Sequence, residues 1–277
     1  LRRFAADDLG LAVGGSYATL TRVDAAQIIY AVSAAPRDRL VPYTWWFPIV
    51  GRMPYRGYFE RADAAALAAE LERDGYDTLV RPAVAFSTLG WFDDPLLSSL
   101  LRADDAQLAE TVVHELTHNT LYVPGHADFN ESFATFVGLH GAAAFFTARG
   151  DPDQAALAEQ RWRDAQQFSR FLAAAVERLN AAYAAGIEPG ARQALFEDLQ
   201  ARYRALPWAT DTYAAFARAP LNNAVILHER LYADRFDVFT AVFRAHHGDL
   251  RGAIAAVVAS AHHADDPYAA LQQANPP

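Results

Sequence analysis

Two histidines four residues apart form the clearest chemical signal in the sequence. They belong to the run His114-Glu115-Leu116-Thr117-His118, which has the pattern H-E-x-x-H. In an α-helix, residues four apart lie about 40° apart on one face and one turn apart in height, so both imidazoles can bind one metal ion. Glu115 can then reach water on that metal and act as a general base. The pattern predicts metal-assisted hydrolysis, although such five-residue matches also occur by chance in ordinary helices.

A third protein ligand is needed if zinc is to keep one coordination position open for water. Glu131 is the candidate, because it follows the Pro124-Gly125 turn and lies in the first turn of a second expected helix. Two helices joined by a short turn pack together and can direct this carboxylate at the histidines. The alternative is a capping box, in which Asp128 and Glu131 satisfy only backbone N–H groups. We expect one Zn²⁺ per chain, held by His114, His118 and Glu131.

The composition limits what else the chain can do. It has 277 residues, no cysteine and nine histidines, so a metal site must use His, Asp or Glu. Lys and Arg total 24 against 33 Asp and Glu, and the resulting net charge of −9 argues against nucleic acid and anionic lipid as partners. The sequence contains no uncharged apolar run of about 18 residues, so no membrane span is expected.

The first 100 residues predict a mixture of strands and helices. Short strands are expected at residues 28–32, 45–50 and 77–86, with a helix at residues 62–73 before the third strand. Pro82 cannot donate a ladder hydrogen bond, so the third strand should lie at a sheet edge or contain a bulge.

From Asp104 onward, almost every segment predicts helix. Asp104 and Gln107 have capping-box spacing at the start of the helix that carries the two histidines. The side of this helix away from the histidines should carry an apolar stripe, formed by Leu108, Val112, Val113 and Leu116. We therefore expect an α+β fold and a single domain over residues 1–277, with a sheet-containing lobe at 1–100 and a helical lobe at 101–277.

The two chemical motifs together resemble the gluzincin metallopeptidases. His114 to His118, followed by Asn130-Glu131-Ser132-Phe133-Ala134, is similar to the H-E-x-x-H and Asn-Glu-x-Phe-Ala elements of the aminopeptidase N type. The spacing departs from that type, because twelve residues separate His118 from Glu131 here and those enzymes have a longer spacer. The resemblance implies a zincin-like fold, with an edge strand above the active-site helix.

A closer resemblance extends over most of the chain. Several separate blocks, in order, are similar to a bacterial family of predicted aminopeptidases: residues 43–48, 55–59, 75–77, 86–95 and 221–224. The resemblance implies a peptidase that acts on peptide substrates in the cell envelope or periplasm, with any lipid anchor in a segment preceding residue 1. Family members often have Cys where this chain has Trp46 and Arg52.

Two groups near the predicted edge strand are candidates for substrate binding. Ser87, Thr88, Leu89 and Gly90 follow the strand that contains Pro82 and could pair with the main chain of a peptide, or could be a plain connection. Asp93 and Asp94 could receive the free amine of a substrate, as an exopeptidase requires, or could simply start a helix before Leu96.

Asn222, Asn223 and Tyr232 match the family in spacing. The two amides could contact substrate or could serve as helix caps. Tyr232 is our candidate for the group that stabilises the oxyanion.

These residues favour a zinc-dependent peptidase, and the resemblance alone favours an aminopeptidase. The alternatives are a zinc endopeptidase, a non-catalytic module that binds zinc or peptide on a zincin scaffold, and an interaction protein in which zinc is structural.

Overall fold

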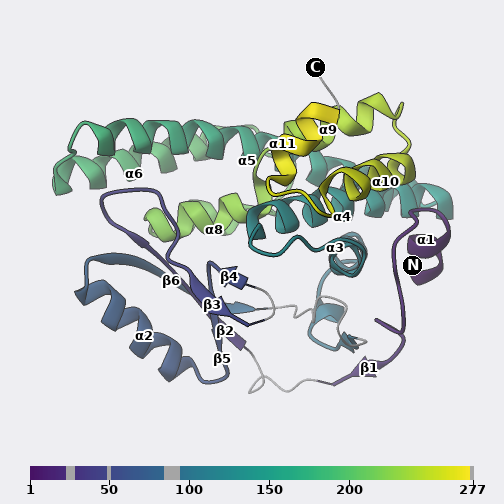
Figure 1. Cartoon of the computed structure of the whole chain (residues 1–277), viewed down its shortest axis with the longest axis horizontal. Helices are drawn as coiled ribbons and strands as arrows, with labels where there is room; N and C mark the ends of the chain where they lie inside the picture. The colour runs from purple at the N-terminus through teal and green to yellow at the C-terminus, as the bar shows by residue number, and fades with distance from the viewer. Residues whose placement is uncertain (23–28, 49–50, 84–93, 275–277) are drawn as a thin grey trace. The chain divides into compact units, whose positions relative to one another are not determined.

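The computed structural model of the chain describes residues 1–22, 29–48, 51–83 and 94–274 (Figure 1). The fold is mixed α+β, 61% helical, with small sheets, which confirms the expected class. The chain divides into two compact units, one with Leu1–Ala26, Val84–Trp162 and Asp234–Pro277, the other with Gln27–Ala83 and Arg163–Ala233. Each unit therefore combines segments from before and after residue 100, where the sequence placed a lobe boundary.

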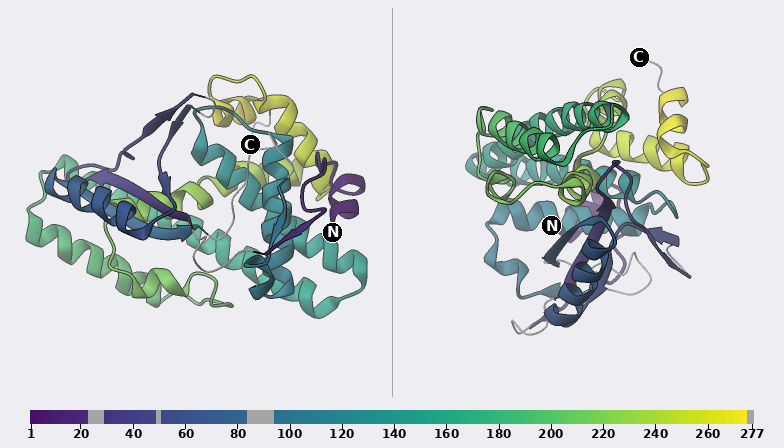
Figure 2. Two further views of the ribbon diagram at one scale, coloured as in Figure 1. Left: turned by 90° about the horizontal axis from the view of Figure 1, so that it is seen from below. Right: turned by 90° about the vertical axis from the view of Figure 1, so that its left-hand side faces the viewer.

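The first unit is mostly helical. Its central elements are α3 (Asp105–Thr120) and α4 (Ala127–Arg149), which pack on each other. The other elements of this unit are α1 (Arg2–Asp7), β1 (Leu20–Thr21), β7 (Leu96–Leu97), a 3-10 helix (Leu100–Arg102), α9 (Phe236–Ala245), α10 (Leu250–Ala261) and α11 (Pro267–Ala274). The C-terminal helices, yellow-green to yellow in Figure 2, pack on one another and on α4.

An aromatic cluster fixes α4 in the core of this unit. Phe129, Phe133 and Phe136 recur at helical spacing along α4, and their ring centroids lie 5.5–5.7 Å from that of Phe239 on α9. All four side chains are almost completely buried. Because α3 covers another side of α4, this helix is buried on more than one face, as its nearly continuous apolar sequence requires.

A three-stranded antiparallel sheet forms the centre of the second unit, with strand order β5 (Arg56–Tyr58), β2 (Ile29–Pro36), β6 (Tyr76–Ala83). Residues 31–35 of β2 are all buried, so both faces of the sheet must be covered. One face packs on α2 (Arg61–Arg73), where Ala64 and Ala68 meet Val32. α8 (Asn223–Ala233) also packs on the sheet, which lies between the two helices (Figure 1).

Two of the expected strands test the sequence reasoning directly. Within the described residues, β6 pairs with β2 alone, with Pro82 opposite Tyr30, so the edge position inferred from Pro82 is confirmed.

The prediction of a single strand at residues 45–50 is wrong. The chain instead forms a two-stranded ribbon, β3 (Trp45–Phe47) and β4 (Gly51–Met53), because Pro48 ends the first strand and Gly51, with φ of 76°, begins the return.

A long helix, α5 (Pro152–Ala184), belongs to the first unit up to Trp162 and to the second unit from Arg163 onward. The second unit also contains α6 (Pro189–Arg204) and α7 (Ala214–Arg218). In the part of the chain that the structure describes, none of the helices has an apolar stretch long enough to cross a bilayer.

Candidate metal centre

The helix that carries the histidines begins as the sequence predicts. Asp104 is the N-cap of α3, and its Oδ1 accepts a hydrogen bond from the backbone N–H of Gln107 at 2.9 Å. Val112, Val113 and Leu116 of the expected stripe are buried, whereas Leu108 is only half-buried. The stripe therefore fixes the rotation of α3 and places His114 and His118 on another face.

This second face of α3 is covered by α4 rather than by solvent. The side chain of His118 is 4% exposed and that of His114 is 14% exposed. The sequence alone gave no reason to expect this burial, because the apolar stripe marks only one face of α3.

A glycine allows the two helices to approach closely at this point. A Cβ atom added at Gly138 of α4 would lie 2.8 Å from the backbone oxygen of Glu110 and 3.2 Å from Cβ of His114. Both distances are shorter than an ordinary contact, so the packing of α4 on α3 beside His114 requires glycine at this position.

The start of α4 lacks the capping-box geometry that the sequence allowed for Asp128 and Glu131. The N-cap is His126, which makes no side-chain cap hydrogen bond, so Asp128 lies inside the helix and Glu131 lies in the second turn rather than the first. Asn130 ties this turn to the preceding loop, because its Nδ2 donates to the carbonyl of Val123 at 2.8 Å and its Oδ1 accepts from the N–H of Val123 at 2.9 Å. The capping-box geometry is therefore absent, and the carboxylate of Glu131 lies beside the two histidines.

Three ligand atoms converge between α3 and α4. Nε2 of His114 and Nε2 of His118 are 3.2 Å apart, and Oε2 of Glu131 lies 3.3 Å from the first and 3.6 Å from the second. Zinc with bond lengths of about 2.0–2.1 Å in tetrahedral geometry places its ligand atoms about 3.3–3.5 Å apart. This spacing, with two imidazole nitrogens and one carboxylate oxygen, fits zinc, and these three side chains are the one group of three or more potential metal ligands among the described residues.

The three side chains also shift one another's pKa values. Burial by itself would raise the pKa of Glu131, but His118 and His114 outweigh it, and the pKa is lowered. Burial by itself would lower the pKa of His118, but the Glu131 carboxylate outweighs it, and the pKa is raised. The site thus holds Glu131 as a carboxylate, which is the form that binds a metal.

The far ring nitrogens of the two histidines have different surroundings. Nδ1 of His114 lies 3.4 Å from the hydroxyl of Thr135 on α4, so this threonine can hold the ring in the tautomer that leaves Nε2 for a metal. Nδ1 of His118 is buried and has no hydrogen-bond partner among the described residues. Thr135 carried no signal in the sequence analysis, although its position four residues after Glu131 places it on the same face of α4.

Glu115 lies at the edge of this centre and is 9% exposed. Burial raises the pKa of its carboxyl group, and the nearby Glu131 and Asp94 carboxylates act in the same direction. Asp94 itself is 5% exposed and belongs to the same unit. The other predicted substrate residues of this region, Ser87, Thr88, Leu89, Gly90 and Asp93, lie outside the described residues.

Asn222 and Asn223 make structural hydrogen bonds in the second unit. Oδ1 of Asn222 accepts from the N–H of Val225 at 2.9 Å, which is an N-cap of α8, and Nδ2 donates to the carbonyl of Thr78 at 3.0 Å. The oxygen and the NH₂ group of the Asn222 side chain therefore both make hydrogen bonds within the unit. Substrate contact by this residue stays a prediction.

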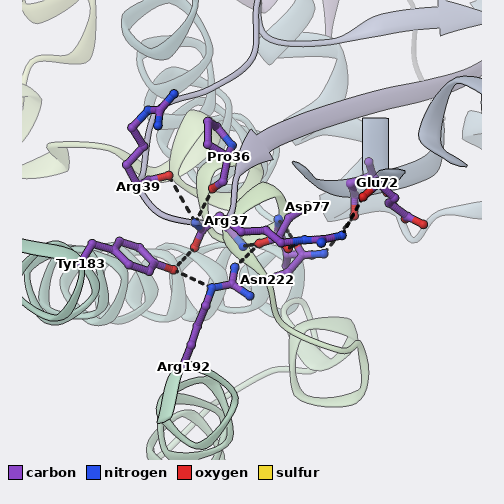
Figure 3. A network of polar contacts seen from close by, with 11 residues as sticks. Pro36, Arg37, Arg39, Glu72, Asp77, Tyr183, Arg192 and Asn222 are labelled. Carbon is purple, nitrogen blue, oxygen red and sulfur yellow. Dashed lines mark hydrogen bonds and ion pairs between the residues drawn. The ribbon is translucent and has the colours of Figure 1, made fainter. Parts of the chain in front are cut away.

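Asn223 takes part in a polar network around the buried Asp77, and other members of this network are labelled in Figure 3. The carboxylate of Asp77 accepts the backbone N–H of Asn223 at 2.9 Å and pairs with Arg37 and Arg192. The side chain of Asn223 has three partners: the carbonyls of Pro36 and Arg39, at 2.8 and 3.2 Å, and the hydroxyl of Tyr183, which donates at 2.6 Å. This network holds α8 against the end of β2 and the start of β6, which accounts for the asparagine pair without a ligand.

Tyr232 also lies in the second unit, one turn after His228 on α8. Its hydroxyl accepts a hydrogen bond from Arg81 of β6 at 3.3 Å. Its role toward an oxyanion stays a prediction.

The structure adds two tyrosines of the first unit that the sequence analysis did not select. Burial and the Glu131 carboxylate raise the pKa of Tyr122 to about 12, and burial together with Glu115 and Asp94 raises the pKa of Tyr17. Both phenols are thus neutral at physiological pH and lie near the carboxylates of the centre. Tyr122 lies in the segment just after α3, four residues beyond His118, whereas Tyr17 is distant from the centre in sequence.

A family model described as "Putative aminopeptidase" matches residues 1–268. A search of curated proteins and a search of solved structures gave no match. The matched region contains α3, α4 and the three convergent side chains between them. Because the match covers nearly the whole length, the chain belongs to the putative aminopeptidase family.

Proposed function

We propose that the chain is a zinc-dependent aminopeptidase with a gluzincin-type centre on a zincin-like scaffold. The observation that carries this proposal is the convergence of His114, His118 and Glu131, with Glu115 between the two histidines. The family supports a peptidase that acts on peptides. A location in the cell envelope rests on the family resemblance alone.

Each residue of the centre has a distinct role in peptide hydrolysis. His114, His118 and Glu131 would hold zinc, which supplies a Lewis acid and lowers the pKa of water to about 7. Glu115 accepts the proton of the attacking water and passes it to the amine of the leaving peptide. Its raised pKa suits both steps, because a carboxyl group that titrates nearer neutrality both takes up and returns a proton readily.

A hydrogen-bond donor must also stabilise the oxyanion, and loss of one such donor costs about 10²–10³ in kcat. Tyr232 is the donor proposed from the sequence, and Tyr122 is a second candidate because its neutral phenol lies near Glu131. Kinetics of Tyr232→Phe and Tyr122→Phe separate them, since only the true donor should lose kcat by that factor with zinc content unchanged.

Glu115→Gln tests the proposed mechanism. The variant keeps the shape of the side chain and removes the base, so hydrolysis of Leu-Gly-Gly should fall by at least about 100-fold with one zinc per chain retained. Glu159→Gln, at an exposed position on α5, is the matched control and should retain full activity.

Three other results would contradict parts of the proposal. Unchanged turnover in the Glu115→Gln variant would rule out Glu115 as the general base. Internal cleavage of N-acetylated peptides at the same rate would indicate an endopeptidase. Bound zinc without hydrolysis of any peptide, with a large fall in melting temperature on chelation, would indicate a structural metal.

A further inference from the structure

Two further histidines lie side by side in the turn that follows α10. The helix ends at Ala261, and its C-cap, His262, is followed directly by His263. The N–H of Ala264 donates to the carbonyl of Ala261 at 3.2 Å, so the chain turns at this pair. Both histidine side chains are exposed, whereas Ala261 on one side of the turn and Tyr268 on the other are buried. The turn is therefore held at both ends while its two imidazoles face solvent.

This turn brings the two imidazole rings together. Nδ1 of His262 lies 2.9 Å from Nε2 of His263. The ring centroids are 4.2 Å apart, and the ring planes are nearly perpendicular, at 89°. Adjacent residues within an α-helix point about 100° apart, so the approach depends on His263 lying beyond the last turn of α10.

A second adjacent pair shows that neighbouring positions alone do not produce this convergence. His246 is the C-cap of α9, and His247 follows it, as His263 follows His262. His247 adopts φ of 54°, which turns the chain in a different way. Within the described residues, no hydrogen bond or ring contact joins the imidazoles of His246 and His247. The convergence therefore belongs to the turn after α10 in particular.

The separation of the two nitrogens indicates which metal ion they suit. Nitrogens bound to one ion at about 2.0–2.1 Å are about 2.8–3.0 Å apart when the two bonds form a right angle, and about 3.3–3.4 Å apart in a tetrahedral site. Right angles are typical of Cu²⁺ and Ni²⁺ with nitrogen and oxygen ligands, and Cu²⁺ binds most tightly among the divalent ions of this row. The spacing of 2.9 Å at His262 and His263 therefore favours Cu²⁺ over zinc.

The charge around the turn also favours a cation. Asp265 is exposed and makes no hydrogen bond or ion pair within the described residues. Asp266 caps α11, because its Oδ1 accepts the N–H of Ala269 at 2.9 Å. The sequence has no Lys or Arg after Arg251, so no basic residue follows the pair along the chain. A divalent cation at the two imidazoles is attracted by the nearby carboxylates.

We propose that His262 and His263 form a surface site for Cu²⁺, with Nδ1 of the first and Nε2 of the second as ligands and water in the remaining positions. Both rings bind as neutral imidazoles. The proton that joins the two nitrogens in the metal-free pair moves to the far nitrogen of its own ring, so that both lone pairs are available. The site is separate from the zinc centre and does not depend on the proposed peptidase function.

Electron paramagnetic resonance of bound Cu²⁺ tests this site. Zinc-loaded protein without a histidine tag receives one equivalent of Cu²⁺, and its zinc content is measured before and after. We expect the copper to bind without release of zinc and to show a tetragonal spectrum with coupling to two imidazole nitrogens. His262→Ala and His263→Ala should each lower the affinity for Cu²⁺ by at least about tenfold, because each removes one of the two imidazole ligands. His247→Ala, which removes an exposed histidine of the other pair, is the matched control and should bind Cu²⁺ as the wild type does.

Three results would overturn the site: unchanged affinity in both His262→Ala and His263→Ala, copper bound only as zinc is released, or an equal loss of affinity in His247→Ala. The altered side chains are exposed, so the variants should fold, and their melting temperatures verify this. Hydrolysis by the zinc-loaded protein without copper judges the proposed peptidase separately. Failure of the copper site therefore leaves the peptidase proposal untouched, and failure of the peptidase leaves the copper site untouched.

Discussion

Replacement of Gly138 by alanine should loosen the contact between α3 and α4 at the candidate metal centre. The added methyl group would lie 2.8 Å from the backbone oxygen of Glu110, and a backbone atom cannot rotate away as a flexible side chain can. A relaxed carbon–oxygen contact needs about 3.3–3.6 Å, so the helices must separate by about 0.5–0.8 Å.

The cost in stability can be estimated from two opposing effects. Overpacking of a core typically costs about 1–3 kcal/mol. Alanine regains about 0.5–1 kcal/mol in a helix interior because it restricts the unfolded chain more than glycine does. We therefore expect Gly138→Ala to lower the free energy of unfolding by about 1 kcal/mol.

The same displacement should weaken metal binding. Glu131 precedes Gly138 by seven residues, about two turns, so both lie on the face of α4 that contacts α3. Metal–ligand distances tolerate only about ±0.2 Å, which is less than the expected displacement. Zinc affinity should fall by about 10–100-fold, the range found when groups around a metal ligand are disturbed.

Denaturant unfolding with and without zinc measures both effects, because zinc adds stability according to its concentration and affinity. Gly190→Ala is the matched control, since an added Cβ meets nothing within 4 Å at that exposed position. If the Gly138→Ala protein is as stable as its parent and binds zinc with the same affinity, the packing of α4 on α3 does not require glycine at this position.

Three further changes test the centre and its surroundings. Glu131→Gln should weaken zinc binding in a competition assay with a chelating dye, because a neutral amide oxygen is a poorer ligand than a carboxylate, and an unchanged affinity would rule out Glu131 as a ligand. Thr135→Val should weaken zinc binding by about 10–100-fold through the loss of its contact with His114, and Thr135→Ser should restore it. Burial among aromatic rings lowers the pKa of His140 to about 4, so this ring is neutral when folded and takes a proton near pH 6.5 when unfolded. The neutral His140 ring therefore contributes its whole share to the free energy of unfolding above about pH 6.5, and this share falls by up to ~3 kcal/mol as the pH is lowered to 4. The difference in unfolding free energy between wild type and His140→Leu, followed by denaturant titration, should therefore shrink as pH falls through this window, and a pH-independent difference would contradict it.

The sequence was sufficient to predict those features that depend on residues close together in the chain. The capping of α3 by Asp104, the spacing of His114 and His118 and the edge position of the strand with Pro82 all follow from residues close in sequence. The ribbon at β3 and β4 was missed because an apolar run concealed the turn signals of Pro48 and Gly51.

The surroundings of the centre follow from contacts between segments distant in sequence. Thr135 meets His114, and Ser16 joins Asp94 to Asn119, only because α4 and residues 12–17 pack on α3. The roles of Asn222 and Asn223 also depend on contacts with distant segments. Their sequence did not distinguish substrate binding from structural roles, and in the structure Asn222 caps α8 and Asn223 bonds to Asp77.

The residues that could bind a metal were predictable from local sequence, because the helical period places two imidazoles on one face and the next helix brings a carboxylate. Their burial, the convergence of their ligand atoms to within 3.6 Å and the side chains around them depend instead on how the helices pack. A helix fixes its own periodicity through local hydrogen bonds, whereas the distance between helices depends on side chains, such as the missing one at Gly138, that meet only after packing.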